Sequence, residues 1–168
     1  MTDFDAIRSQ FPILRQQVNG HPLIYLDSGA TAQKPQSVID AESKFYETIN
    51  AGVHRGAHTL AGRSTVAFEE ARAQVAKLVG ASYEEGNEEL VVTMGATDGL
   101  NTLATAFGNA SLGRGGKSAQ RFALNPGDAI VVSRAEHHSV LLPFHELATS
   151  TGATFKSFAL DDAGRIPA

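Results

Sequence analysis

The feature that most constrains the fold is an alternation of short apolar runs with helical patterns in the second half of the chain. The runs at 90–93 and 128–133 are rich in β-branched and aliphatic residues, and each is followed by apolar residues at helical spacing. The second of these helices is expected to begin near Pro143 or just before it, and a third apolar run follows at 153–160. Strands that alternate with helices usually pair in parallel. The sequence therefore predicts an α/β fold with a mostly parallel sheet flanked by helices.

The first half of the chain predicts helices joined by loops. Apolar residues recur at helical spacing at 36–50 and 64–81, and Gly80 suits the C-terminal cap of the second helix. The run at 23–26 predicts a short strand before a loop of small residues. The segment 109–127 is rich in Gly, Ser and Asn, which is typical of a surface loop.

The composition excludes several classes of function. The 168 residues are 42% hydrophobic and 19% charged, an ordinary globular balance. The net charge of −4 gives no electrostatic reason to expect nucleic acid or an acidic membrane surface as a partner. No apolar run approaches the roughly 18 residues of a spanning helix, and the N-terminus does not resemble a secretory signal. We therefore expect a cytoplasmic protein.

Cysteine is absent from the sequence. This excludes disulfides, cysteine ligation of zinc or iron–sulfur clusters, and thiol catalysis within these residues.

The stretch "TMGATDGLN" is a candidate anion site. A strand is predicted to end here, and a helix to begin at about Thr97. The free N–H groups and the positive dipole end of a helix attract anions, and the hydroxyl of Thr97 could add a donor. The alternative is an ordinary strand-to-helix turn that Thr97 or Asp98 caps.

The stretch "GVHRGAHTL" places His54, Arg55 and His58 in a loop between two predicted helices. Arg55 could bind a carboxylate or a phosphate. The alternative is a solvated basic loop without a ligand. His54 and His58 have the spacing of a helical zinc pair, but two glycines argue against a helix here, and no carboxylate supports the pair.

The stretch "SRAEHHSV" contains the adjacent histidines His137 and His138 where a strand is followed by a helix. Adjacent side chains point in different directions, so we do not expect them to chelate one metal ion. The carboxyl end of a parallel strand is where α/β folds bind ligands. A single histidine there could stack on an aromatic cofactor or move a proton, while the other is structural.

Four motifs in order, "YLDSGATAQKP", "VHRGAHTL", "GATDGLN" and "AEHHSVLLPF", resemble the N-terminal part of PLP-dependent cysteine desulfurases of the SUF type. These group II enzymes, with the related selenocysteine lyases, belong to the class V aminotransferase superfamily. The resemblance extends from Phe4 to about Arg165. It implies a fold-type I PLP-dependent transferase in which 1–20 is a helical segment on the small-domain side. Residues 21–168 would be the N-terminal part of the large PLP-binding domain.

The resemblance also implies roles for particular residues. His137 matches the histidine that stacks on the pyridine ring of pyridoxal 5'-phosphate and assists proton transfer. Thr97 and the backbone of Ala96 match the turn that holds the cofactor phosphate, although Ala96 replaces a common threonine. No metal site is implied. His54 and Arg55 match the loop at the active-site mouth, near the substrate and the dimer interface, and Ala30 matches a backbone position near the substrate carboxylate.

The activity that the resemblance implies converts L-cysteine to L-alanine and an enzyme-bound persulfide. A homodimer would pass this sulfur to an acceptor protein of the SUF system for iron–sulfur cluster assembly.

The chain lacks the persulfide cysteine, and none of its lysines lies in a motif that resembles the Schiff-base segment. We therefore expect a fragment that is inactive alone. The alternatives are a selenocysteine lyase, another class V enzyme, or a non-catalytic remnant that acts as an interaction module.

Overall fold

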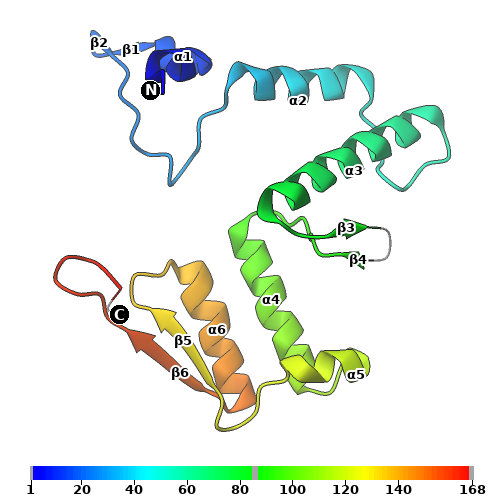
Figure 1. Ribbon diagram of the computed structural model, residues 1–168, viewed down its shortest axis with the longest axis vertical. Helices are drawn as coiled ribbons and strands as arrows, with labels where there is room; N and C mark the ends of the chain where they lie inside the picture. The colour runs from blue at the N-terminus through cyan, green and yellow to red at the C-terminus, as the bar shows by residue number, and fades with distance from the viewer. Residues whose placement is uncertain (1, 85–86, 167–168) are drawn as a thin grey trace. The chain divides into compact units, whose positions relative to one another are not determined.

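The computed structural model describes residues 2–84 and 87–166 (Figure 1). The chain divides into two compact units, Met1–Leu90 and Val91–Ala168. Within the described residues, no helix is both long enough and apolar enough to cross a membrane.

The first unit is built from helices and small antiparallel hairpins. Its described elements are α1 (Phe4–Ser9), the 3₁₀-helix η1 (Pro12–Arg15), β1 (Gln17–Val18) paired with β2 (His21–Pro22), α2 (Gln36–Thr48), α3 (Thr59–Val79), and β3 (Tyr83–Glu84) paired with β4 (Asn87–Glu88).

Helix α3 is fixed at both ends by its local sequence. At its start, the Nδ1 atom of His58 accepts the N–H of Ala61 at 3.4 Å. At its end, Gly80 adopts φ +73°, a left-handed conformation that a residue without Cβ accepts easily. The C-terminal cap predicted at Gly80 is confirmed. Ala61, Ser64 and Ala76 are buried along the helix.

The second unit contains a strand–helix–strand motif. Its described elements are α4 (Ala96–Ser111), α5 (Gly116–Ala119), the 3₁₀-helix η2 (Gln120–Phe122), β5 (Ala129–Ser133), α6 (His138–Thr151) and β6 (Thr154–Phe158). The strands β5 and β6 are parallel, with Ala129 opposite Thr154 and Ser133 opposite Phe158. This parallel pair is the arrangement that the alternating pattern predicts.

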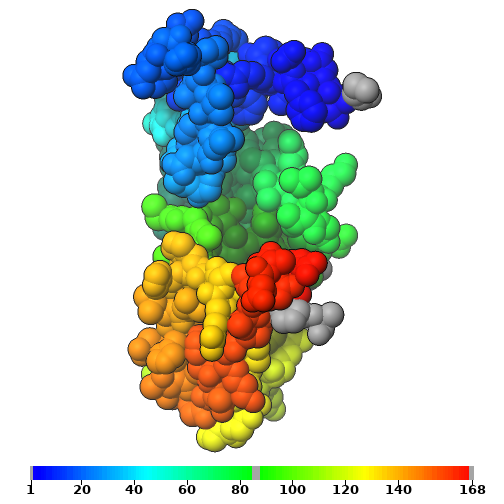
Figure 2. All heavy atoms as spheres, turned by 90° about the vertical axis from the view of Figure 1, so that its left-hand side faces the viewer, coloured from blue at the N-terminus to red at the C-terminus, as the bar shows by residue number. Residues whose placement is uncertain are grey.

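Helix α6 lies between the strand pair and α4 (Figure 1). The side chains of β5, α6 and β6 form one continuous body (Figure 2). The core is made of small and branched residues, because Ala104 and Ala110 of α4 are buried with Leu147 of α6. A Cβ on Gly108 would lie 3.5 Å from Leu147 Cδ1, so the backbone of α4 passes close to α6.

The structure contradicts the strands expected at 23–26 and 90–93. Neither run pairs with another strand among the described residues. The side chains of Ile24 and Leu26 are 78% and 91% exposed. A strand exists only when a neighbouring strand accepts hydrogen bonds from its N–H groups and donates hydrogen bonds to its C=O groups, so an apolar run of high β-propensity does not form one alone.

Two further expectations are wrong in detail. The segment 109–127 is not a plain loop, since it holds the end of α4, α5 and η2. There the ring of Phe122 packs edge-on against Phe107, with centroids 5.9 Å apart. Helix α6 begins at His138, earlier than the start expected near or just before Pro143, and this proline lies inside the helix. Packing of α6 on three neighbouring elements outweighs the lost backbone hydrogen bond.

Candidate functional site

The N-terminus of α4 is free of a side-chain cap. Gly95 is its N-cap residue, with φ +95°, and no side chain bonds to the first turn. The first backbone bond at this end runs from the N–H of Gly99 to the carbonyl of Gly95 at 3.1 Å. Because the initial N–H groups of a helix have no intrahelical acceptor, those of Ala96 and Thr97 remain available to a ligand.

The polar side chains around this helix start are already arranged. The carboxylate of Asp98 accepts the N–H of Met94 at 2.9 Å, and the hydroxyl of Thr93 donates to the carbonyl of Gly95 at 3.1 Å. Asp98 therefore does not cap α4, and neither does Thr97. The hydroxyl of Thr97 has no hydrogen-bond partner among the residues that the structure describes.

His137 begins helix α6 as its N-cap residue. Its Nδ1 atom accepts the N–H of Ser139 at 3.1 Å and lies 2.9 Å from the Ser139 hydroxyl oxygen. A ring nitrogen that accepts this N–H carries no proton, so the neutral ring carries its proton on Nε2. The cap thus fixes both the orientation of the imidazole and the nitrogen that faces away from the helix.

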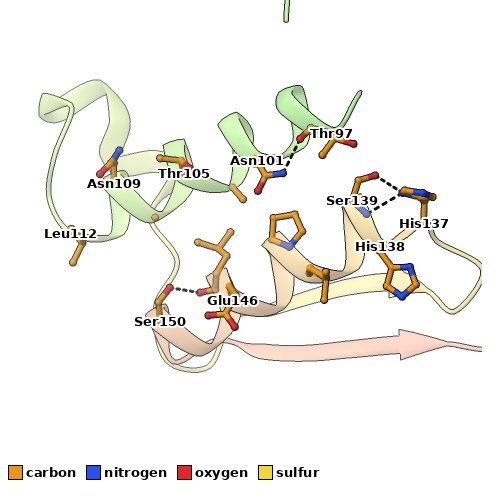
Figure 3. A pocket seen from close by; sticks show the side chains of 15 residues that line it. Thr97, Asn101, Thr105, Asn109, Leu112, His137, His138, Ser139, Glu146 and Ser150 are labelled. Atoms are coloured by element: carbon orange, nitrogen blue, oxygen red, sulfur yellow. Dashed lines mark hydrogen bonds between the residues drawn. The ribbon is translucent and has the colours of Figure 1, made fainter. Parts of the chain in front are cut away.

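His138 points away from His137. The two ring centroids are 6.3 Å apart and the ring planes are at 81° (Figure 3). Across residues 2–84 and 87–166, no group of three or more His, Cys, Asp or Glu side chains is placed to hold a metal ion.

A pocket of about 760 Å³ lies between α4 and α6. Thr97 and His137 line one end of it, and Leu112 and Ser150 line the other (Figure 3). The structure therefore brings together the two side chains for which the sequence predicts cofactor contacts. Ala96 lies beside them as the first residue of α4.

This end of the pocket suits a ligand with a phosphate group and a flat aromatic ring. An uncapped helix N-terminus with a free hydroxyl at Thr97 provides donors for the phosphate. The exposed imidazole of His137, whose orientation is fixed by Ser139, provides a flat surface for the ring. The donor set and the ring surface fit pyridoxal 5'-phosphate.

Ala30 lies in a turn of the first unit. Its N–H and that of Thr31 both donate to the carbonyl of Asp27 at 3.1 Å. The hydroxyl of Tyr25 closes the same turn by donating to the carbonyl of Thr31 at 2.6 Å. The Ala30 side chain is exposed, and its N–H is engaged within the turn.

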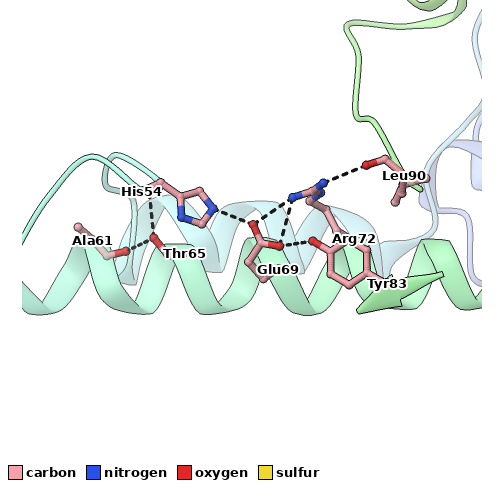
Figure 4. A network of polar contacts seen from close by, with 7 residues as sticks. All are labelled: His54, Ala61, Thr65, Glu69, Arg72, Tyr83 and Leu90. Carbon is pink, nitrogen blue, oxygen red and sulfur yellow. Dashed lines mark hydrogen bonds and ion pairs between the residues drawn. The ribbon is translucent and has the colours of Figure 1, made fainter. Parts of the chain in front are cut away.

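His54 and Arg55 lie in the loop that precedes α3, also in the first unit. The Nε2 atom of His54 is 2.7 Å from the carboxylate of Glu69 (Figure 4). Arg55 is exposed, and no ion pair or hydrogen bond of its guanidinium is found among the described residues. His58 caps α3, so the three polar side chains of this loop have different surroundings.

Sequence reasoning missed the acceptor of His54. Glu69 on α3 also accepts hydrogen bonds from Arg72 and from the hydroxyl of Tyr83 (Figure 4). The hydrogen bond from Tyr83, followed by that from His54, lowers the pKa of Glu69 below its ordinary value of 4.5. Partial burial and the hydrogen bond to Glu69 raise the pKa of Tyr83 above 10.0. The spacing of Glu69 and Arg72, three residues apart on a predicted helix, is the only sign in the sequence that Glu69 takes part in an ion pair.

Comparison with known sequences relates the chain to one enzyme family. A profile of the family "Aminotransferase class-V" matches residues 24–168. A protein named "Probable cysteine desulfurase" from Vibrio cholerae is 44% identical over 166 residues, which are 99% of this chain and 37% of that protein.

Two solved structures resemble this one. A cysteine desulfurase from Thermococcus onnurineus matches with a TM-score of 0.71 and 32% identity, covering 96% of this chain and 34% of that one. The cysteine desulfurase CsdA from Escherichia coli matches with a TM-score of 0.68 and 34% identity, covering 96% of this chain and 36% of that one. The chain thus spans just over a third of the length of these proteins.

Proposed function

The chain belongs to the aminotransferase class-V family, and from this premise we propose that it forms part of a PLP-dependent cysteine desulfurase. The predicted α/β fold of PLP-dependent transferases agrees with the match to two cysteine desulfurase structures. Within the whole enzyme, residues 1–20 lie on the small-domain side and residues 21–168 form the first part of the large domain.

The observation that carries the proposal is the convergence of Thr97 and His137 on one pocket. The N–H groups of Ala96 and Thr97, with the Thr97 hydroxyl, bind the phosphate of pyridoxal 5'-phosphate. The imidazole of His137 would face the pyridine ring, and its Nε2 atom would hold or pass a proton there. When bound, the cofactor withdraws electrons from the substrate and so labilises the bonds at its α-carbon.

The substrate is L-cysteine, and the products are L-alanine and an enzyme-bound persulfide. The resemblance assigns His54 and Arg55 to the loop at the active-site mouth, near the substrate and the dimer interface. It assigns the backbone of Ala30 to a position near the substrate carboxylate. The cofactor-binding lysine and the sulfur-accepting cysteine are supplied by a part of the enzyme outside these 168 residues, so the fragment is inactive alone.

The proposal extends to the setting of the enzyme. It acts in the cytoplasm as a homodimer of the SUF type. It passes sulfur to an acceptor protein for iron–sulfur cluster assembly. The similarity of four ordered motifs to SUF-type enzymes supports this assignment.

Alanine release from L-cysteine by the full-length protein, loaded with pyridoxal 5'-phosphate, tests the proposal. Thr97→Val removes the hydroxyl at nearly constant size, and we expect cofactor affinity to fall about 5-fold to 10-fold. Thr102→Val on the exposed side of α4 is the matched control and should bind the cofactor like the wild type.

Three outcomes would contradict the proposal. Turnover of L-selenocysteine without turnover of L-cysteine would identify a selenocysteine lyase. A folded full-length protein that binds no cofactor would support a non-catalytic module. Equal cofactor affinity in Thr97→Val and Thr102→Val would remove Thr97 from the site.

A further inference from the structure

A second groove lies on helix α4, and it shares no lining residue with the pocket of Thr97 and His137. Its volume is about 380 Å³. On one side it is lined by α5 and η2, which follow α4 in the chain, and η2 packs against α4 (Figure 1). The other side is a stripe of α4 at the spacing i, i+3, i+4, i+7, which places four apolar residues on one face of the helix: Leu103, Ala106, Phe107 and Ala110.

The segment that carries α5 and η2 is fixed to the end of α4. The hydroxyl of Ser111 accepts the N–H of Leu124 at 2.8 Å and donates to the carbonyl of Phe107 at 2.8 Å. The ring of Phe122 packs edge-on against the ring of Phe107. Because both sides of the groove are already ordered, a ligand that binds there loses little affinity to the ordering of the protein.

Large apolar side chains in the groove are in contact with solvent. Leu103 is 46% exposed and Phe122 is 45% exposed. The stripe from Leu103 to Ala110 extends over about two turns of α4, or roughly 10 Å along the helix axis. A partner helix that lies in such a groove contacts it through side chains at i, i+3, i+4 and i+7, which extend over the same length.

The segment beside the groove is basic, although the chain as a whole is acidic. It carries Arg114, Lys117 and Arg121, and no Asp or Glu occurs between Asp98 and Asp128. The net charge of the whole chain is −4. None of the three cations forms an ion pair with the residues that the structure describes. The positive charge of this segment is therefore available to an acidic partner.

Arg121 joins the charged part of this surface to the apolar part. It lines the groove, and its guanidinium lies 4.6 Å from the centroid of the Phe122 ring. Contact with an aromatic ring holds the cation beside the apolar side chains. Lys117 is exposed and precedes Ser118, which also lines the groove. A carboxylate next to an apolar side chain would meet both cations without displacing an acidic residue of this segment.

We propose that the groove between α4 and the segment of α5 and η2 is a docking site for an acidic amphipathic helix of a partner protein. The apolar side chains of the partner helix enter the groove, and its carboxylates pair with Arg121 and Lys117. Charge complementarity favours this occupant, because a purely apolar one would leave both cations without a partner. The inference does not rest on the proposed function, since neither cofactor nor substrate takes part in it.

Fluorescence anisotropy with the full-length protein tests the inference. The probe is a labelled helical peptide with leucine at positions i, i+3, i+4 and i+7 and glutamate at the positions between them. The control peptide has lysine in place of each glutamate. We expect the glutamate peptide to bind about 10-fold more tightly than the lysine peptide, and we expect this difference to shrink at high salt, which screens exposed charges.

Substitutions locate the binding site on the protein. Arg121→Glu and Lys117→Glu reverse a charge, and each should lower the affinity for the glutamate peptide about 10-fold. Leu103→Gln replaces an apolar side chain of the stripe and should have an effect of similar size. The matched control is Lys44→Glu on α2, because Lys44 is also an exposed cation and does not line the groove. This variant should bind like the wild type.

Equal affinity for the two peptides would overturn the inference, and so would undiminished affinity in Arg121→Glu. Absence of peptide binding would also overturn it. In that case a lower Tm of Leu103→Gln would assign the groove to another segment of the full-length chain, and a smaller oligomer of Leu103→Gln would assign it to a second copy.

Two controls keep the result decisive. If Leu103→Gln does not fold, the two charge reversals decide alone, because both side chains are exposed. Binding of the glutamate peptide by a full-length protein that lacks cysteine turnover would refute the proposed function and leave the docking site standing.

Discussion

At the scale of single residues, His137 combines a structural contact with a chemical one. Its Nδ1 atom accepts the N–H of Ser139 at the start of α6, which directs Nε2 away from the helix. A histidine is an uncommon N-cap residue, since Asn, Asp and Ser are preferred at that position. The choice of histidine is understandable if the ring has a second task, which the proposed function assigns to it.

Substitution of His137 should separate these two contributions. Asparagine is a good N-cap residue, so His137→Asn should retain the stability of α6, whereas His137→Ala should lose about 1 kcal/mol. Both variants lack the imidazole, and we expect turnover to fall by about 10²-fold or more. Thermal unfolding and alanine release from the full-length enzyme measure the two effects.

His21→Ala is the control, because that ring is exposed and does not line the pocket. Wild-type turnover in His137→Asn would contradict the chemical role. Equal stability of the Asn and Ala variants would contradict the contribution of the cap.

Glu69 should make stability depend on pH in the acidic range. Its folded-state pKa lies below 4.5, chiefly because of the hydrogen bonds from Tyr83 and His54. A depressed carboxyl pKa stabilises the folded state above the unfolded pKa, and this contribution is lost as pH falls through the folded pKa. We expect Tm to fall more between about pH 5 and about pH 3 in the wild type than in Glu69→Gln. Equal slopes in the two proteins would contradict the contribution of this network.

At the scale of elements, helix α3 shows how one residue type has opposite effects at two positions. Gly80 occupies the C-terminal cap at φ +73°, with no atom within 4 Å of a built Cβ. Gly62 lies within the helix, also with no atom within 4 Å of a built Cβ. Both positions therefore have room for a Cβ atom, and only the backbone conformation distinguishes Gly80 from Gly62.

We expect Gly80→Ala to destabilise the protein by about 1 kcal/mol, because alanine is strained at positive φ. We expect Gly62→Ala to stabilise it by about 0.5–1 kcal/mol, because alanine has the higher helix propensity. Chemical denaturation of the two variants measures both signs. If both substitutions changed the free energy of unfolding in the same direction, backbone conformation would not be what distinguishes Gly80 from Gly62.

The elements also show what local sequence can predict. The start of α4 could be predicted within a residue, because Gly95 and the small residues around it are a local signal. The start of α6 was misplaced because Pro143 is usually a sign of a helix start, whereas the actual cap is His137. The expected strands at 23–26 and 90–93 failed because pairing depends on residues distant in sequence.

In the candidate site too, some contacts could be predicted from local sequence and others could not. Thr97 and His137 were predicted from motifs at the ends of apolar runs, and the structure places both at one pocket. The contact between His54 and Glu69 joins a loop to a helix, and spacing along the chain does not reveal it. The predicted roles of Ala30, His54 and Arg55 toward a substrate stay predictions.

At the scale of the whole molecule, several large apolar side chains are solvent-exposed. Leu26 and Met94 are 91% and 94% exposed, although apolar side chains of this size are usually buried. The chain corresponds to 34–36% of the two cysteine desulfurase structures that it matches. We expect other parts of the full-length enzyme to cover these side chains.

A crystal structure of the full-length protein with pyridoxal 5'-phosphate tests the central claim most directly, since that claim concerns where the cofactor binds. The account predicts that the phosphate accepts hydrogen bonds from the N–H groups of Ala96 and Thr97 at the start of α4. It also predicts that the pyridine ring stacks on the imidazole of His137. A cofactor bound with its phosphate away from α4, or with its ring away from His137, would contradict the account.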